Sequence, residues 1–174
     1  MPTFSTSGHP LETARLRLEP LRADRADEAW PNLDDERMWL FFPDLRPRSL
    51  EELRATYARR ERGFPGPAHE EVWENWLARD RTTGRLIGDA QATISPQRSV
   101  ALIAYSTYAA YQRNGYARET VRAVIEHLRT HHAVHRAVAE IAGGNAASYR
   151  LIESLGFIRT KATDDELTYE RLLG

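Results

Sequence analysis

A mostly apolar run, a short turn and a helical pattern follow one another between residues 100 and 130 of this chain. The run from Val100 to Thr107 is typical of a strand that is covered on both faces of a sheet. From about Asn114 to Thr130 apolar residues recur at helical spacing. A buried strand that passes directly into an amphipathic helix predicts a mixed α/β (α+β) fold.

The rest of the chain adds strands and helices on both sides of this segment. Asp24 is predicted to cap a first helix, and Ser49 with Glu52 forms a capping-box pattern that predicts a second. Thr82 to Gly84 reads as a hairpin turn. Further strands are expected at 15–19, 73–80, 86–94, 137–141 and 166–172, with another helix at 145–154.

Length and composition limit the classes of protein that remain. A chain of 174 residues suits one domain, which we place at 14–174 after a loose lead-in at 1–13. The net charge of -1 argues against general nucleic-acid binding, and the absence of cysteine excludes disulfides and thiolate metal sites. Without a signal-type or membrane-spanning apolar run, we expect no membrane association and a cytoplasmic location.

The turn from Tyr111 to Ala117 is the most informative segment for function. The first turn of a helix carries unpaired N–H donors and the positive end of the dipole, so it suits a phosphate. Gly115 and the small Ala117 would let an anion approach the backbone, and Arg113 could add charge at the rim. An ordinary strand-to-helix turn that contains a glycine is the alternative interpretation.

Here the sequence resembles the GCN5-related N-acetyltransferase (GNAT) family. The family signature for coenzyme A is Gln/Arg-x-x-Gly-x-Gly/Ala, and Gln112, Gly115 and Ala117 fill it. Many members have Gly after the Gln, where this chain has Arg113, at a free position of the signature. The departure is therefore minor.

A second match to the family lies about thirty residues downstream. Members show an Asn, a Ser three residues on, and a Leu-Gly-Phe ending, which here are Asn145, Ser148 and 155–157. Asn145 also suits a helix N-cap, and both roles can hold together. Residues 15–22 and 38–53 look like the ribosomal-protein alanine N-acetyltransferase (RimJ/RimL-like) subgroup.

The resemblance implies an acetyl-CoA-dependent N-acetyltransferase with the GNAT acyl-CoA N-acyltransferase fold. That fold has one mostly antiparallel sheet with helices on both faces, in which the strand after residue 100 and the strand near 137 splay apart around the cofactor. The implied partners are acetyl-CoA and an amine acceptor, in a monomer or homodimer. The implied cofactor-binding residues are Ser106, Thr107, Tyr108, Gln112, Arg113, Asn114, Gly115, Tyr116, Ala117 and Asn145.

Acyl transfer to an amine needs a group that accepts the amine proton. Glu140, on the strand before Asn145, and Asp89, on the strand after the hairpin, are the candidate bases. Either can instead be a solvated strand residue, and a water chain could replace both. A backbone N–H at the end of the 100–107 strand would polarise the thioester carbonyl.

The departing thiolate needs a proton donor. Many members carry a tyrosine seven residues after the Asn, but this position is Ile152 here. The ribosomal subgroup implies Ser148 as the acid, with Tyr149 as the fallback; a plain helix serine is the alternative interpretation.

Several other features admit two interpretations. His127, His131 and His135 are spaced by four and His132 adjoins, but we expect surface histidines and no metal because the helix should end near His132. Trp39, Phe41 and Phe42 could line an acceptor pocket, although a core or helix-packing role is favoured. The loop around Phe64 could be a lid or a surface connection.

The acceptor is not specified by any motif. A protein or peptide α-amine is favoured, and a small amine such as a polyamine or an aminoglycoside is the rival. Clustered acids at 34–36 and 164–166 would suit a polycation if they faced the slot. A non-catalytic acetyl-CoA sensor is the competing class, because the family tyrosine is missing at Ile152.

Overall fold

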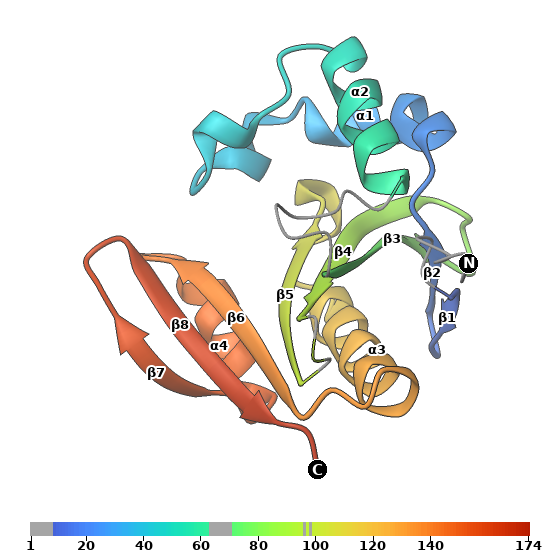
Figure 1. The fold of residues 1–174 in the computed structure, drawn as a ribbon. Helices are drawn as coiled ribbons and strands as arrows, with labels where there is room; N and C mark the ends of the chain where they lie inside the picture. Colours follow the sequence, from blue (N-terminus) through green and yellow to red (C-terminus); the bar gives the residue numbers. More distant parts are fainter. Residues whose placement is uncertain (1–8, 63–70, 96, 98) are drawn as a thin grey trace.

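The computed structural model describes residues 9–62, 71–95, 97 and 99–174, and in them an eight-stranded sheet has the order β1-β2-β3-β4-β5-β6-β8-β7 (Figure 1). The strands are β1 (Leu11–Glu12), β2 (Leu16–Pro20), β3 (Val72–Asp80), β4 (Leu86–Ile94), β5 (Val100–Thr107), β6 (Arg136–Ala142), β7 (Ile158–Ala162) and β8 (Glu166–Leu172). The helices are α1 (Ala26–Leu33), α2 (Leu50–Glu61), α3 (Tyr116–His131) and α4 (Ala146–Ser154). Short 3-10 turns are η1 (Ala23–Arg25), η2 (Glu36–Trp39), η3 (Pro43–Leu45) and η4 (Ala109–Tyr111).

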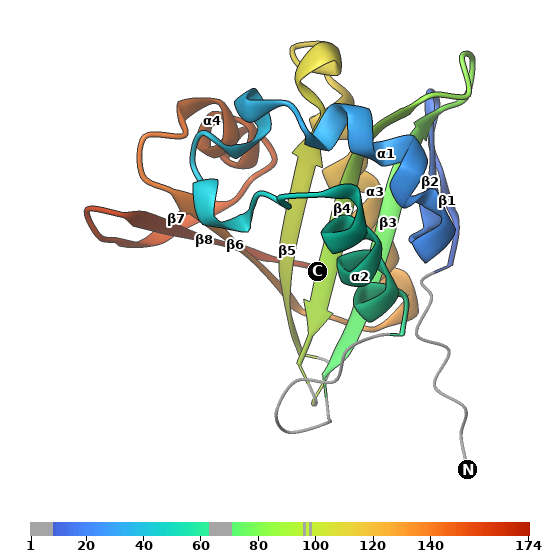
Figure 2. The same cartoon turned by 90° about the horizontal axis from the view of Figure 1, so that it is seen from above.

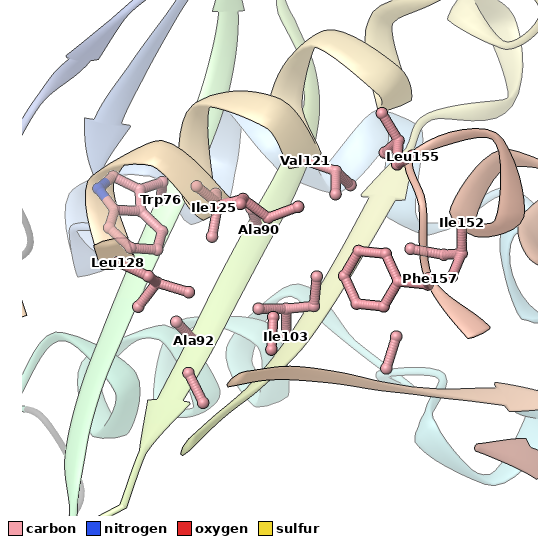
Figure 3. Close-up of a cluster of buried hydrophobic side chains, with 14 of the residues drawn as sticks. Trp76, Ala90, Ala92, Ile103, Val121, Ile125, Leu128, Ile152, Leu155 and Phe157 are labelled. Atoms are coloured by element: carbon pink, nitrogen blue, oxygen red, sulfur yellow. The ribbon is translucent and has the colours of Figure 1, made fainter. Parts of the chain in front are cut away.

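Helices cover both faces of this sheet, as Figure 2 shows. Neighbouring strand residues point to opposite faces, so Trp76 packs in the core beneath α3 while Leu77 packs in a second core beneath α1 and α2. The α3 face holds the larger core (Figure 3). Its labelled members are Trp76, Ala90, Ala92, Ile103, Val121, Ile125, Leu128, Ile152, Leu155 and Phe157.

The predicted hairpin is confirmed. The Asp80 carboxylate accepts hydrogen bonds from the backbone N–H groups of Thr82 and Thr83, and Gly84 has a φ of 71°, which completes the turn between β3 and β4. Ser49 caps α2 by accepting from the Glu52 N–H at 3.2 Å. The reciprocal bond of a capping box goes one residue further back, from the Arg48 N–H to Glu52 at 2.8 Å.

Two local expectations are wrong. Asp24 lies inside η1 and pairs with Arg22, while α1 begins at Ala26 without a side-chain cap. The expectation that β5 is covered on both faces fails at Leu102, which is 37% exposed. The larger core covers only one face of β5 at this point, because Ala101 and Ile103 pack in it while Leu102 points to the other side.

The parallel pair β5–β6 is short. Its register covers only Val100 to Leu102 on β5 and Arg136 to Val138 on β6, although both strands continue beyond these residues. The two ribbons diverge from there, with β8 and β7 continuing the sheet on the far side of β6 (Figure 1). The predicted splay is thus present in the middle of the sheet.

The mixed, mostly antiparallel fold with flanking helices is confirmed. Among the residues that the structure describes, none of the helices combines the length and apolar character needed to cross a membrane.

Candidate active site

The N-terminus of α3 opens onto the surface at the turn that follows β5. Gly115 occupies the N-cap position with a φ of 78°, and no side chain caps the helix there. Gln112 to Gly115 are exposed, so the backbone amides of the turn are accessible. Because α3 has 16 residues, its first turn presents a full set of unpaired N–H donors and the positive end of the dipole. This geometry suits a pyrophosphate.

Side chains of the turn brace its own backbone. Gln112 donates from Nε2 to the Thr107 carbonyl at 3.1 Å, and Asn114 donates from Nδ2 to the carbonyls of Tyr111 and Gln112 at 3.1 and 3.0 Å. Arg113 also has a positive φ, 64°, which is costly for a residue with a Cβ. These bonds use carbonyl groups of the loop and hold it in shape without involving its backbone N–H groups.

Arg15 also holds this turn, and sequence reasoning missed it. Its Nη1 donates to the Asn114 carbonyl at 2.9 Å, and its guanidinium carbon lies 4.6 Å from the centroid of the Tyr116 ring. Glu119 in the first turn of α3 accepts from Arg15 Nε at 2.7 Å. The partners are about 100 residues apart in the chain, so no local motif could have indicated the contact.

Near its end, the edge of β5 that faces β6 has backbone groups that β4 does not pair, and among them the Thr107 carbonyl already accepts from Gln112 Nε2. Tyr108 N–H donates to the Ile87 carbonyl at 2.8 Å, and antiparallel pairing uses alternate residues, so Ser106 is also bonded toward β4. The main-chain groups of Tyr105 and Thr107 therefore point to the side where β6 has diverged. An extended arm of a ligand can pair with them as a strand would.

Two predicted residues of β4 and β5 are in contact. Ser106 donates from Oγ to Asp89 Oδ2 at 2.9 Å on the face toward α2. Burial raises the pKa of the Asp89 carboxyl, while Arg60 and Ser106 oppose the shift. Gly88 is required beside this pair, because a Cβ there would lie 2.2 Å from the Ser106 carbonyl oxygen.

Glu140, the other candidate base, is exposed on β6. The register of β5 with β6 puts it on the same sheet face as Ser106, because Leu102 is paired with Val138 and side chains alternate. Asp89 and Glu140 therefore face the same side, across the divergence of the strands. Asp89 differs in being partly buried and hydrogen-bonded, which are the properties of a tuned base.

The candidate acid lies on the opposite face. Ser148 Oγ is 2.7 Å from the Tyr105 hydroxyl, and the Asn145 side chain accepts from the Ser148 N–H at 3.2 Å, which confirms Asn145 as the N-cap of α4. Burial raises the pKa of Tyr105 to about 12. Ile152 is fully buried in the core, and Tyr149 packs at its edge. Tyr105 was missed because the contact joins residues 43 apart.

The aromatic segment between α1 and α2 differs from its favoured interpretation. Phe41 and Phe42 are 42% and 46% exposed, so a core position is wrong for them, whereas Trp39 packs against the second core and donates from Nε1 to the Leu33 carbonyl at 2.7 Å. Phe41 reaches the β6–α4 loop, because its Cε1 lies 4.0 Å from where a Cβ on Gly144 would be. The loop around Phe64 lies outside the described residues.

The histidine prediction is also partly wrong. His131 and His135 are exposed, but His127 is only 2% exposed and His132 is half-buried. The reason is that the last turn of α3 packs against β3, where His127 bonds to Glu74. These residues are at the end of α3 that is remote from the glycine turn.

Comparisons with known proteins identify the family of this chain. The family model of the acetyltransferase (GNAT) domain matches residues 15–158. YkkB of Bacillus subtilis (strain 168) is 33% identical over 90 residues, which cover 49% of this chain and 51% of YkkB, so the match spans about half the length of that relative.

Solved structures share the fold over nearly the whole chain. A GNAT-family acetyltransferase from Bacillus anthracis has a TM-score of 0.78 at 17% identity, with 94% of this chain and 98% of that one covered. RimL, a ribosomal L7/L12 α-N-protein acetyltransferase, has a TM-score of 0.79 at 18% identity, with 95% of this chain and 94% of that one covered. Spermidine N-acetyltransferase from Vibrio cholerae, in a complex with CoA and spermine, has a TM-score of 0.76 at 16% identity, with 92% of this chain and 96% of that one covered.

The family match includes β5, the glycine turn, α3 and α4, which carry the candidate site. RimL among the similar structures agrees, at the level of the fold, with the expected subgroup. The chain therefore belongs to the GNAT acetyltransferase family, as the sequence motifs predicted.

Proposed function

We propose that this protein transfers the acetyl group of acetyl-CoA directly to the N-terminal α-amine of a protein or peptide. The observation that carries the proposal is the open edge of β5, between a partly buried carboxylate on one sheet face and a hydroxyl pair on the other. Acetyl-CoA would place its pyrophosphate on the amides from Gln112 to Ala117 and its pantetheine along this edge.

The reaction then uses groups on both faces. The amine nitrogen attacks the thioester carbonyl carbon, the new C–N bond forms, and the C–S bond breaks. Asp89 accepts the amine proton, directly or through water, and Tyr105 protonates the departing thiolate with Ser148 as its relay. A backbone N–H of Tyr105 or Thr107 would stabilise the developing oxyanion.

An α-amine suits this site because a substantial fraction of it is already neutral near pH 7. With a pKa of about 7.7–8.0, roughly a fifth to a third of the α-amine is neutral at pH 7.4, whereas a lysine amine of pKa about 10.4 is about one part in a thousand neutral. The exposed apolar segment formed by Leu40, Phe41 and Phe42 lies beside the β6–α4 loop and would contact the first side chains of a peptide.

The acidic cluster at 34–36 gives little support to a polycation. Asp35 pairs with Arg37, and Asp34 and Glu36 both pair with Arg46 at 3.2 and 3.3 Å. The cluster at 164–166 is exposed at the β7–β8 turn, where the Asp165 carbonyl accepts from the Gly143 N–H at 2.7 Å. This position next to the β6–α4 loop is the observation that keeps a polyamine as the second candidate.

The test is a thiol-release assay with acetyl-CoA and three acceptor panels: N-terminal peptides, their N-acetylated counterparts, and polyamines with aminoglycosides. We expect turnover with free N-terminal peptides and none with the blocked ones. Turnover with polyamines alone would establish the second candidate. Tight acetyl-CoA binding without turnover in any panel would identify a sensor, and absence of CoA binding would contradict the assigned cofactor site.

A further inference from the structure

A group of metal-ligating side chains lies at the C-terminal end of α3. Glu74 on β3, His127 on α3 and His132 just after α3 each offer one ligand atom, and these atoms all lie within 4.8 Å of one another. Glu74 is 6% and His127 2% exposed, and the His132 side chain is 13% exposed. We propose that these three residues bind a divalent transition metal ion, with zinc favoured by the ligand set.

The distances from the Glu74 carboxylate to the two imidazole nitrogens are close to those between the ligand atoms of a metal ion. Glu74 Oε2 lies 2.8 Å from His127 Nε2 and 3.2 Å from His132 Nε2. Zinc bonds of about 2.0–2.1 Å in tetrahedral geometry separate ligand atoms by roughly 3.3 Å. An ion would need the Glu74–His127 pair to open by about 0.5 Å, and it would bring the two imidazole nitrogens, which lie within 4.8 Å of each other, to about the same separation.

Hydrogen bonding within the protein does not satisfy this group. Both ring nitrogens of His132 and the Nδ1 of His127 are buried without a hydrogen-bond partner among the described residues, although His132 Nε2 is near the carboxylate. Unpaired buried polar atoms are costly, and the set here is of the kind that metals satisfy.

The ligand types indicate the ion. Two imidazoles and one carboxylate form a nitrogen–oxygen set that suits zinc and leaves a fourth position for water. Two further imidazoles lie at the rim, because the ring centroids of His131 and His9 are 4.7 and 6.2 Å from that of His127.

The site is separate from the acetyl-transfer site. Helix α3 has 16 residues, which at about 1.5 Å per residue puts its two ends roughly 24 Å apart. The coenzyme A turn precedes the first residue, and the metal ligands include the last turn. An ion here would fasten the end of α3 to β3 and stabilise the folded state by mass action, without contact with the cofactor.

The experiment is zinc titration by calorimetry on the tag-free full chain after chelator treatment, with Co²⁺ as a spectroscopic probe. We expect one Zn²⁺ per chain, a rise in Tm with zinc, and visible Co²⁺ bands of a low-coordination site. His132→Ala and Glu74→Gln should each weaken zinc binding by more than roughly 100-fold, since even residues behind the ligands are worth 10–100-fold.

His135→Ala is the matched control, because His135 is an exposed histidine three residues from His132 and is not in the ligand set. It should bind zinc like the wild type. Circular dichroism checks that each variant folds. If the variant at the more buried Glu74 does not fold, His132→Ala still tests the proposal. Equal zinc affinity in wild type, His132→Ala and His135→Ala would overturn the proposal, as would absence of a specific zinc site in the wild type.

Discussion

Tyr105 on β5 is our proposed acid, because α4 lacks the tyrosine that the family resemblance implies. The position at which the family resemblance implies a tyrosine is Ile152, and its side chain is part of the core. The Tyr105 hydroxyl instead meets Ser148 at 2.7 Å. The sequence indicates Ser148 through its spacing from Asn145, but the pairing with Tyr105 depends on how α4 lies across β5, which no local pattern specifies.

Tyr105→Phe removes this hydroxyl and keeps the ring. If Tyr105 is the acid, we expect kcat to fall by about 10²-fold or more with little change in the KM for acetyl-CoA. Ser148→Ala should cost less, because it removes only the relay. Steady-state thiol release measures both, with Tyr149→Phe as the control. A larger effect at Ser148 than at Tyr105 would reverse the two roles.

Substitutions at Asp89 and at Glu140 should affect the pH profile of kcat/KM differently. A base must be ionised, and burial raises the pKa of Asp89, so the acidic limb of kcat/KM should lie at higher pH than for an ordinary aspartate. Asp89→Asn should remove that limb and lower kcat/KM by about 10²–10⁴-fold. Glu140→Gln should leave both unchanged. If neither substitution alters the profile, a water chain is the base and the assignment to Asp89 is wrong.

At the scale of elements, the sequence predicted the helices, strands and turns that depend on neighbouring residues. The hairpin depends on a positive φ at Gly84, the glycine turn depends on positive φ at Arg113 and Gly115, and the period of α3 reflects one buried face. Strand β7 was missed because all five of its residues are exposed, so no alternation of apolar and polar residues marks it. Asp24 was misplaced because its partner is Arg22 and not the helix backbone.

The glycine turn can be tested against a second glycine with the same backbone strain. Gly115 and Gly84 have φ values of 78° and 71°, so alanine at either should cost about 1–2 kcal/mol of stability in urea unfolding. Only Gly115→Ala should also weaken CoA binding in calorimetry, because Gly115 belongs to the turn whose backbone N–H groups line the proposed pyrophosphate site. Equal CoA affinity in the two variants would contradict this role.

At the scale of the whole molecule, Glu119 joins the N-terminal segment to the cofactor side of the fold. It accepts from Thr13 Oγ1 at 2.6 Å and from the Arg15 N–H at 2.8 Å. Burial alone would raise its pKa, but these bonds and the Arg15 charge lower it overall. The joined residues are more than 100 apart in the chain, so composition and periodicity could not predict the contact.

Glu119→Gln should therefore destabilise the protein by about 1–3 kcal/mol near neutral pH. A lowered folded-state pKa contributes stability above the unfolded pKa of about 4.3 and loses it as the pH falls through the folded value. The difference between wild type and variant in urea unfolding should thus shrink in acid. Glu126→Gln, at an exposed pair with Arg129 on the same helix, should change little at either pH. A pH-independent difference at Glu119 would contradict the linkage.

The divergence of β5 and β6 has a consequence for solution behaviour. It places an open strand edge in the middle of the sheet, with Leu102 37% exposed beside it, and an unpaired edge can also pair with another copy of the chain. A cofactor arm that lies along this edge would occupy the groups through which copies could self-associate. The acetyl donor would then lower the tendency of the protein to self-associate through this edge.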